Sequence, residues 1–99
     1  MQEGITTEKS NRIIVTVLGL DKIGIIAWVS GRLAEHSISI QDISQTILQG
    51  FFTMIMIVDM TSSTISLGDL AELLKNEGQE RGLKVRVQHE DVFSFMHRV

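Results

Sequence analysis

The fold is decided by the stretch from Arg12 to Gly24, which reads RIIVTVLGLDKIG. Its first part, Ile13–Leu18, carries apolar side chains at both odd and even positions, so both faces of the predicted strand are largely apolar. Such a strand is typical of the middle of a sheet. The remaining residues, Gly19–Gly24, have a glycine at each end and predict a turn. This stretch therefore predicts a central strand that leads into a tight connection.

A helix and a second strand are predicted after this turn. From Ile25 to Glu35 apolar residues recur at helical spacing, with Ile26 and Leu33 predicted to share the buried face. Ile38–Leu48 returns to strand alternation, but the parity of its isoleucines changes partway along. A bulge near Gln41-Asp42 would bring all of these isoleucines to one face, because a single extra residue reverses the alternation.

The second half of the chain supplies the remaining elements. Phe51–Met60 reads as a third strand, joined to the second in a hairpin by Gln49-Gly50. Ser66 offers a hydroxyl to cap a second helix, and Gly82 is suited to end it. Leu83–Glu90 alternates apolar and polar residues, which indicates a strand with one exposed face.

The predicted order of elements is β-α-β-β-α-β, which indicates an α+β protein of the ferredoxin-like sandwich type. This fold has a four-stranded antiparallel sheet with two helices on one face. Residues 1–11 are polar and predict a flexible N-terminal tail, and residues 12–99 predict a single domain. The residues expected to share one core are Leu33, Leu70, Val15 or Val17, and Met54 or Ile55. Since the central strands are apolar on both faces, the face without helices is expected to need a cover.

The composition excludes several classes of protein. The 99 residues contain nine Lys and Arg against twelve Asp and Glu, a net charge of −3, whereas a nucleic-acid-binding domain carries a basic face. Without cysteine the chain has no disulfide framework and no thiolate metal site. Its most apolar segment, Phe51–Val58, is shorter than the roughly 20 residues of a membrane span, and Met1–Gly4 lacks the basic start of a secretory signal. We therefore expect a cytoplasmic protein with no nucleic-acid partner and no membrane association.

Several segments together resemble the ACT domain, a family of small regulatory modules that usually bind amino acids or related metabolites. They are the strand Ile13–Val17, the turn Asp21–Gly24 before a helix, and Ser39–Ile43. The segment Asp42–Thr46, followed by Phe52–Met54, resembles more narrowly the stand-alone ACT proteins of about this length. The resemblance covers nearly the whole chain after the tail, and it implies that residues 12–99 form one ACT-like domain.

The turn before the first helix is the candidate ligand site. Unpaired N–H groups and the positive end of the helix dipole at Gly24 favour an anion such as a carboxylate, and a glycine lets a ligand approach the backbone. Asp21 offers an acceptor for an ammonium group, and Ser39-Ile40 is expected to close the pocket from the same or a neighbouring subunit. The expected ligand-binding residues are Asp21, Gly24, Ile25, Ile26, Ser39 and Ile40. The alternative is that Asp21 only caps the helix and Gly24 only permits a turn.

Two positions depart from the better-known amino-acid-binding ACT domains. These domains often have Arg-Pro where Lys22-Ile23 stands here, and Asn where Ser39 stands. A hydroxyl supplies one donor where a side-chain amide supplies two, so the ligand is expected to differ from theirs.

No residue is predicted to be catalytic or to bind a metal, and no cofactor is expected. His36, His89 and His97 are far apart in the sequence and lack the helical pairing of a metal site. The sequence also lacks a Gly-x-Ser-x-Gly nucleophile elbow. Trp28 lies between the apolar and polar sides of the first helix, where it is either half-buried or the anchor of an interface.

The sequence thus predicts a non-enzymatic regulatory module that binds a small molecule, an amino acid or a related metabolite, and acts as a homodimer. A regulated protein partner would respond to the ligand-bound dimer. Two alternatives remain open, a ligand-free protein–protein interaction module and a small metabolic enzyme, because ferredoxin-like folds host many activities.

Overall fold

A computed structural model describes residues 11–20 and 23–92, and within them the chain follows the predicted β-α-β-β-α-β order. The elements are β1 (Arg12–Gly19), α1 (Ile25–Glu35), β2 (Ser39–Leu48), β3 (Phe51–Asp59), α2 (Leu67–Glu80) and β4 (Lys84–His89). Most of the predicted tail, residues 1–10, lies outside the described residues. The last residue assigned to it, Asn11, accepts a hydrogen bond on its carbonyl oxygen from the Met60 N–H at 2.9 Å. Asn11, one residue before β1, therefore takes part in the fold.

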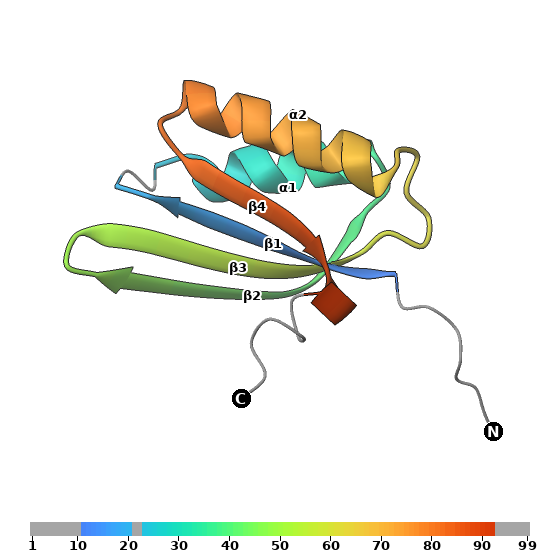
Figure 1. The fold of residues 1–99 in the computed structure, drawn as a ribbon, viewed down its shortest axis with the longest axis horizontal. Helices are drawn as coiled ribbons and strands as arrows, with labels where there is room; N and C mark the ends of the chain where they lie inside the picture. The colour runs from blue at the N-terminus through green and yellow to red at the C-terminus, as the bar shows by residue number, and fades with distance from the viewer. Residues whose placement is uncertain (1–10, 21–22, 93–99) are drawn as a thin grey trace.

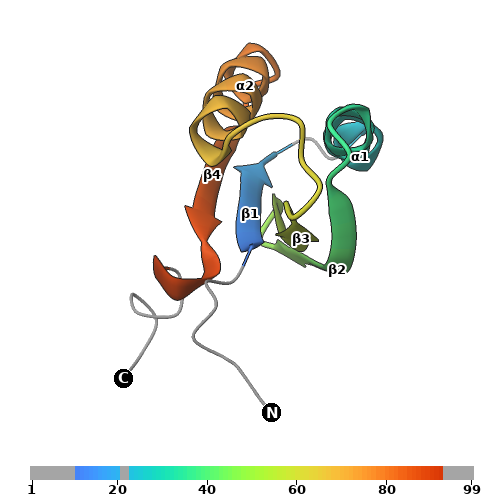
Figure 2. The same ribbon diagram turned by 90° about the vertical axis from the view of Figure 1, so that its right-hand side faces the viewer.

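The four strands form one antiparallel sheet in the order β2-β3-β1-β4, which places β1 and β3 in the middle. Both helices lie on the same face of this sheet, α1 towards β2 and α2 towards β4 (Figure 1, Figure 2). The structure therefore confirms the predicted ferredoxin-like sandwich. β1 is apolar on both faces, and a strand of this kind is typical of the middle of a sheet, where neighbouring elements cover it.

The predicted bulge in β2 is present. Ile40 lies opposite Val58 of β3, whereas Asp42 lies opposite the next residue, Ile57, so Gln41 is the extra residue. The extra residue reverses the alternation of side chains. As a result the isoleucines on both sides of the bulge lie on the helix-covered face of the sheet, as the change of parity predicted.

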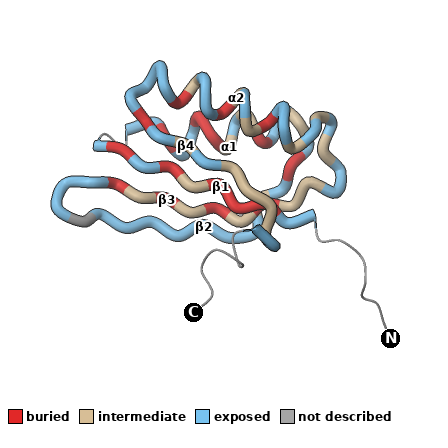
Figure 3. The backbone as a smooth tube through the Cα atoms, viewed as in Figure 1, coloured by how far each residue is buried: buried red, intermediate tan, exposed pale blue. Residues whose placement is uncertain are grey.

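The core lies between the sheet and the two helices, where buried segments of all layers face one another (Figure 3). Its members are Ile13, Val15, Val17, Ile25, Trp28, Val29, Leu33, Ile38, Phe52, Met54, Met56, Val58, Leu70, Leu74 and Leu83. The predicted core is confirmed, and of the two alternatives on β3 it is Met54 that lies inside. Ile55 faces the other side of the sheet, opposite Thr16 of β1.

One residue of α1 was assigned to the wrong face. Ile26 was predicted to be buried with Leu33, but it is 38% exposed, while its neighbour Ile25 is buried. The sequence predicts that Trp28 is either half-buried or the anchor of an interface. In the structure it is 8% exposed and belongs to the core. Because Ile26 is about 200° around the helix from Trp28, turning the tryptophan inward turns Ile26 outward.

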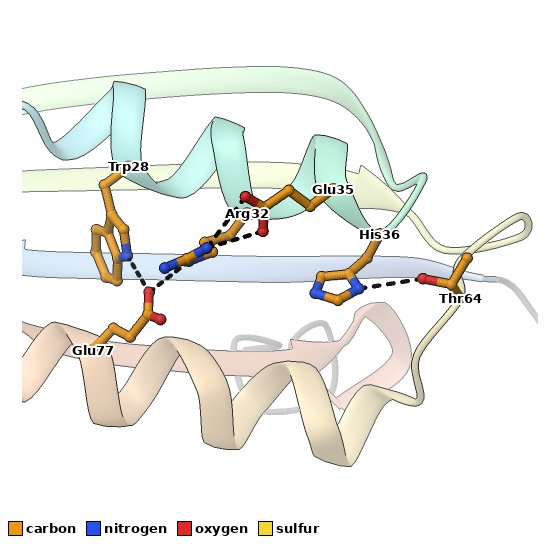
Figure 4. Close-up of polar contacts among 6 residues, drawn as sticks. All are labelled: Trp28, Arg32, Glu35, His36, Thr64 and Glu77. Carbon is orange, nitrogen blue, oxygen red and sulfur yellow. Dashed lines mark hydrogen bonds and ion pairs between the residues drawn. The ribbon is translucent and has the colours of Figure 1, made fainter.

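A polar contact joins the two helices above the core (Figure 4). The indole N–H of Trp28 donates to Oε1 of Glu77 at 2.7 Å, and Nε of Arg32 donates to the same oxygen at 2.8 Å. The hydrogen bond from Arg32, and then the one from Trp28, hold the pKa of the Glu77 carboxyl below its usual value. This contact satisfies the indole donor and fixes how α1 is rotated against α2.

Candidate functional site

A cleft of about 220 Å³ opens at the start of α1. Its lining residues are Ile23, Gly24, Ile25, Arg81 and Leu83. The topology brings these segments together, because β4 pairs with β1 so that Lys84 lies opposite Leu18. The start of β4 therefore lies beside the turn that leads from β1 into α1. We call this cavity the α1 cleft.

Gly24 is the N-cap of α1 and has the left-handed conformation, with φ 76° and ψ −1°. A Cβ added to it would meet no atom within 4 Å, so the position faces open space. Its carbonyl oxygen accepts from the N–H of Trp28 at 2.9 Å and begins the helix. Within the described residues the N–H groups of Ile25 and Ile26 have no acceptor, as expected for a first helical turn without a side-chain cap.

The cleft holds a positive charge opposite this helix start. The guanidinium carbon of Arg81 lies 4.7 Å from the centre of the Trp28 ring. Arg81 is the C-cap of α2, and Gly82 follows with φ 73°, as the predicted helix-ending glycine should. Leu83 packs against Gly19, where a Cβ would overlap the leucine side chain. The cleft thus combines apolar side chains with an arginine and with backbone N–H groups that lack an acceptor among the described residues.

The structure brings together only some of the predicted ligand-binding residues. Gly24 and Ile25 line the α1 cleft, whereas Ile26, in the same first turn of α1, is not among its lining residues. Asp21 falls outside the described residues. Ser39 and Ile40 begin β2, beyond the end of the 11-residue helix α1, which is roughly 16 Å long at 1.5 Å per residue. Within one chain, therefore, Ser39 and Ile40 lie at the opposite end of α1 from the cleft.

Arg81, Leu83 and Ile23 line the cleft but were not predicted from the sequence. A signal for two of them was available in the predicted topology. In a β-α-β-β-α-β fold the last strand pairs with the first, so residues before the last strand return to the first turn. Arg81 and Leu83, on either side of the helix-ending Gly82, are in that position.

A smaller hollow of about 150 Å³ lies between α2 and β4, lined by Lys75, Gln79, Leu83, Lys84 and Val85. Across residues 11–20 and 23–92 no three His, Asp or Glu side chains gather as a metal site would require. In the same residues no helix is long and apolar enough to cross a membrane.

Comparison with known proteins identifies the family. The sequence profile of the ACT domain matches residues 11–88. The chain belongs to the ACT-domain family. It is 51% identical to a UPF0237 protein of Methanopyrus kandleri over 89% of this chain and 98% of that protein. A UPF0237 protein of Clostridium perfringens is 48% identical over 87% of this chain and 97% of its own length.

Solved structures agree with this assignment of an ACT domain. An ACT domain protein from Streptococcus pneumoniae superposes with a TM-score of 0.73 at 38% identity, covering 83% of this chain and 92% of that one. A formyltetrahydrofolate deformylase from Pseudomonas syringae gives a TM-score of 0.70 at 23% identity, covering 78% of this chain and 26% of the deformylase. The second match is a similarity of fold only, and it extends over about a quarter of that enzyme.

Proposed function

We propose that this ACT domain is a non-enzymatic regulatory module of the cytoplasm that binds an amino acid or a related small metabolite at the start of α1. The observation that carries the proposal is the α1 cleft, in which left-handed Gly24 leaves open space beside free N–H groups. These N–H groups favour an anion, and the absent side chain allows it to approach the backbone. The bound metabolite would stabilise one arrangement of the dimer, and a partner protein would bind that arrangement in preference to the other.

The exposed edge of β2 supports the proposal that the module is a homodimer. β2 is an edge strand, and its helix-side residues Ile43 and Ile47 are 37% and 55% exposed. The hairpin that carries Ile47 reaches past the start of α1 (Figure 1). On the opposite face of the sheet Ile14 is 4% exposed and Leu18 is 40% exposed. A second copy on the β2 edge would cover Ile43 and Ile47, together with Ile26 of α1.

Antiparallel pairing of two β2 edges would also complete the predicted ligand site. Ile47 lies in the same row of the sheet as Gly19, whereas Ser39 lies at the opposite end, beside Asp59. A two-fold axis between the β2 strands brings the Ser39 end of one copy to the Ile47 end of the other. Ser39 and Ile40 of the second copy would then lie beside the start of α1.

The first test of the dimer is its mass in light scattering at micromolar concentration, where the wild type is expected to be dimeric. Ile47→Asp is expected to give a monomer, because it places a charge in the apolar surface that the second copy would bury. Thr46→Asp is the matched control, since its side chain points to the other face of the same strand. A monomeric wild type would contradict the dimer, and dissociation by Thr46→Asp alone would place the interface on the sheet face.

Ligand binding is tested by thermal unfolding of the full chain with each of the twenty amino acids. A ligand that binds only the folded state at 100 times its dissociation constant adds about 2.7 kcal/mol. For a domain of this size we expect a rise in Tm of roughly 10 °C or more. No shift with any amino acid would favour the ligand-free interaction module. Consumption of the compound during incubation would favour the enzyme.

A further inference from the structure

We propose that Arg81 is the residue that selects an anionic ligand in the α1 cleft and holds its carboxylate. The proposal rests on the proposed function of that cleft and names its ligand class, a small carboxylic acid. Arg81 and Gly24 both line the cleft, so a carboxylate bound there could accept from the guanidinium and from the backbone N–H groups at the helix start.

The backbone of Arg81 is held in place by close packing at the end of α2. Its N–H donates to the carbonyl oxygen of Gly78 at 2.9 Å, and the N–H of Leu83 donates to the same oxygen at 2.8 Å. A Cβ on Gly78 would lie only 2.6 Å from Cγ2 of Val85 and 3.5 Å from Cη2 of Trp28. The end of α2 therefore packs directly against β4 and Trp28, and this packing fixes the position of the Arg81 backbone at the cleft.

The side chain of Arg81 is held by the tryptophan below it. Its guanidinium carbon lies 4.7 Å from the centre of the Trp28 ring, and the ring itself is locked by the 2.7 Å hydrogen bond to Glu77. A guanidinium stacked on an aromatic ring has one face covered but keeps its N–H edge for a partner. A carboxylate can bind that edge with two parallel hydrogen bonds.

Among the described residues no hydrogen bond or ion pair joins Arg81 to a carboxylate, although its charge helps to lower the pKa of the Glu77 carboxyl. Glu77 accepts from Trp28 and Arg32 through one oxygen, and the ion pairs formed by arginines in this part of the chain involve Arg12 and Arg32. None of the five residues that line the cleft is acidic. The described lining of the cleft therefore carries one positive charge and no negative charge, which favours a carboxylate there.

The test is calorimetric titration of the full chain with glycine, alanine, serine and aspartate, each beside the amide in which the α-carboxylate is a carboxamide. We expect at least one acid to bind the wild type, and its amide to bind at least about tenfold more weakly. Arg81→Met should lower the affinity for the acid by at least about tenfold, because methionine keeps a long apolar side chain but removes the charge-assisted hydrogen bonds to the carboxylate. The affinity of Arg81→Lys for the acid should lie between those of the wild type and Arg81→Met, since an ammonium keeps the charge but cannot form two parallel hydrogen bonds. The matched control Lys84→Met removes a charge nearby but outside the α1 cleft and should bind as the wild type does.

The possible failures are distinguishable. Equal affinity of the wild type and Arg81→Met for the acid overturns the role of Arg81 and leaves the proposed function standing. Absence of binding by the wild type across the panel overturns this inference, while the thermal unfolding with all twenty amino acids tests the proposed function separately. If Arg81→Met loses the near-ultraviolet circular dichroism of Trp28 while Arg81→Lys folds and binds as the wild type does, Arg81 has only a structural role and the inference is wrong.

Discussion

Leu70→Ala is expected to lower the free energy of unfolding by about 2–5 kcal/mol, a large share of the stability of a small domain. Leu70 is 0% exposed and belongs to the same buried cluster as Leu33 and Met54. Helix α2 cannot move in to fill the space that the truncation leaves. It is fixed at one end by the Ser66 hydroxyl, which accepts from the Asp69 N–H at 3.1 Å, and at the other end by the packing that follows Gly78.

Chemical denaturation measures this loss, at one fixed protein concentration because the proposed dimer makes stability depend on concentration. Leu73→Ala is the matched control, with the same change on the same helix at a partly exposed position. It is expected to cost less than half as much as Leu70→Ala. A loss below about 1 kcal/mol for Leu70→Ala, or equal losses for the two variants, would show that α2 packs through a different face.

The fold could be predicted from local sequence patterns because each helix and strand shows its own periodicity of apolar residues. In β2 the parity change of the isoleucines has one economical explanation, an inserted residue, and the structure places it at Gln41. The hydroxyl of Ser66 and the glycine at position 82 similarly mark the two ends of α2. Once the elements are known, the apolar character of β1 on both faces puts it in the middle of the sheet.

The parts that the sequence did not predict depend on contacts between distant segments. Periodicity alone does not decide which of the adjacent isoleucines 25 and 26 faces the core, because both fit the apolar side of a helix. The decision comes from Trp28, whose indole donates to Glu77 of α2 and thereby sets the rotation of α1. Arg81 joins the cleft for a similar reason, since its place follows from the packing of α2 and β4 rather than from neighbours in the sequence.

Gly24→Val is expected to abolish binding of any ligand found at the start of α1. Two effects act at this position. The glycine has φ 76°, a conformation that costs an ordinary L-residue about 1–2 kcal/mol and is especially poor for a β-branched one. Because an added Cβ meets no protein atom within 4 Å, the new side chain would occupy the open space where ligand and backbone meet. Binding is measured by calorimetry at matched folded fraction, so that loss of folded protein is not read as loss of affinity.

Two further variants separate strain from obstruction. Gly50→Val carries the same strain, since Gly50 has φ 85° and open space around it, but it lies in the β2–β3 hairpin turn and should retain the wild-type affinity. Gly24→Asn places a side chain at the start of α1 with little strain, because asparagine tolerates the left-handed region, and should still weaken binding strongly. If folded Gly24→Val and Gly24→Asn both bind with wild-type affinity, the ligand does not contact the start of α1. Gly24 would then only permit the turn before α1, which is the alternative that the sequence leaves open.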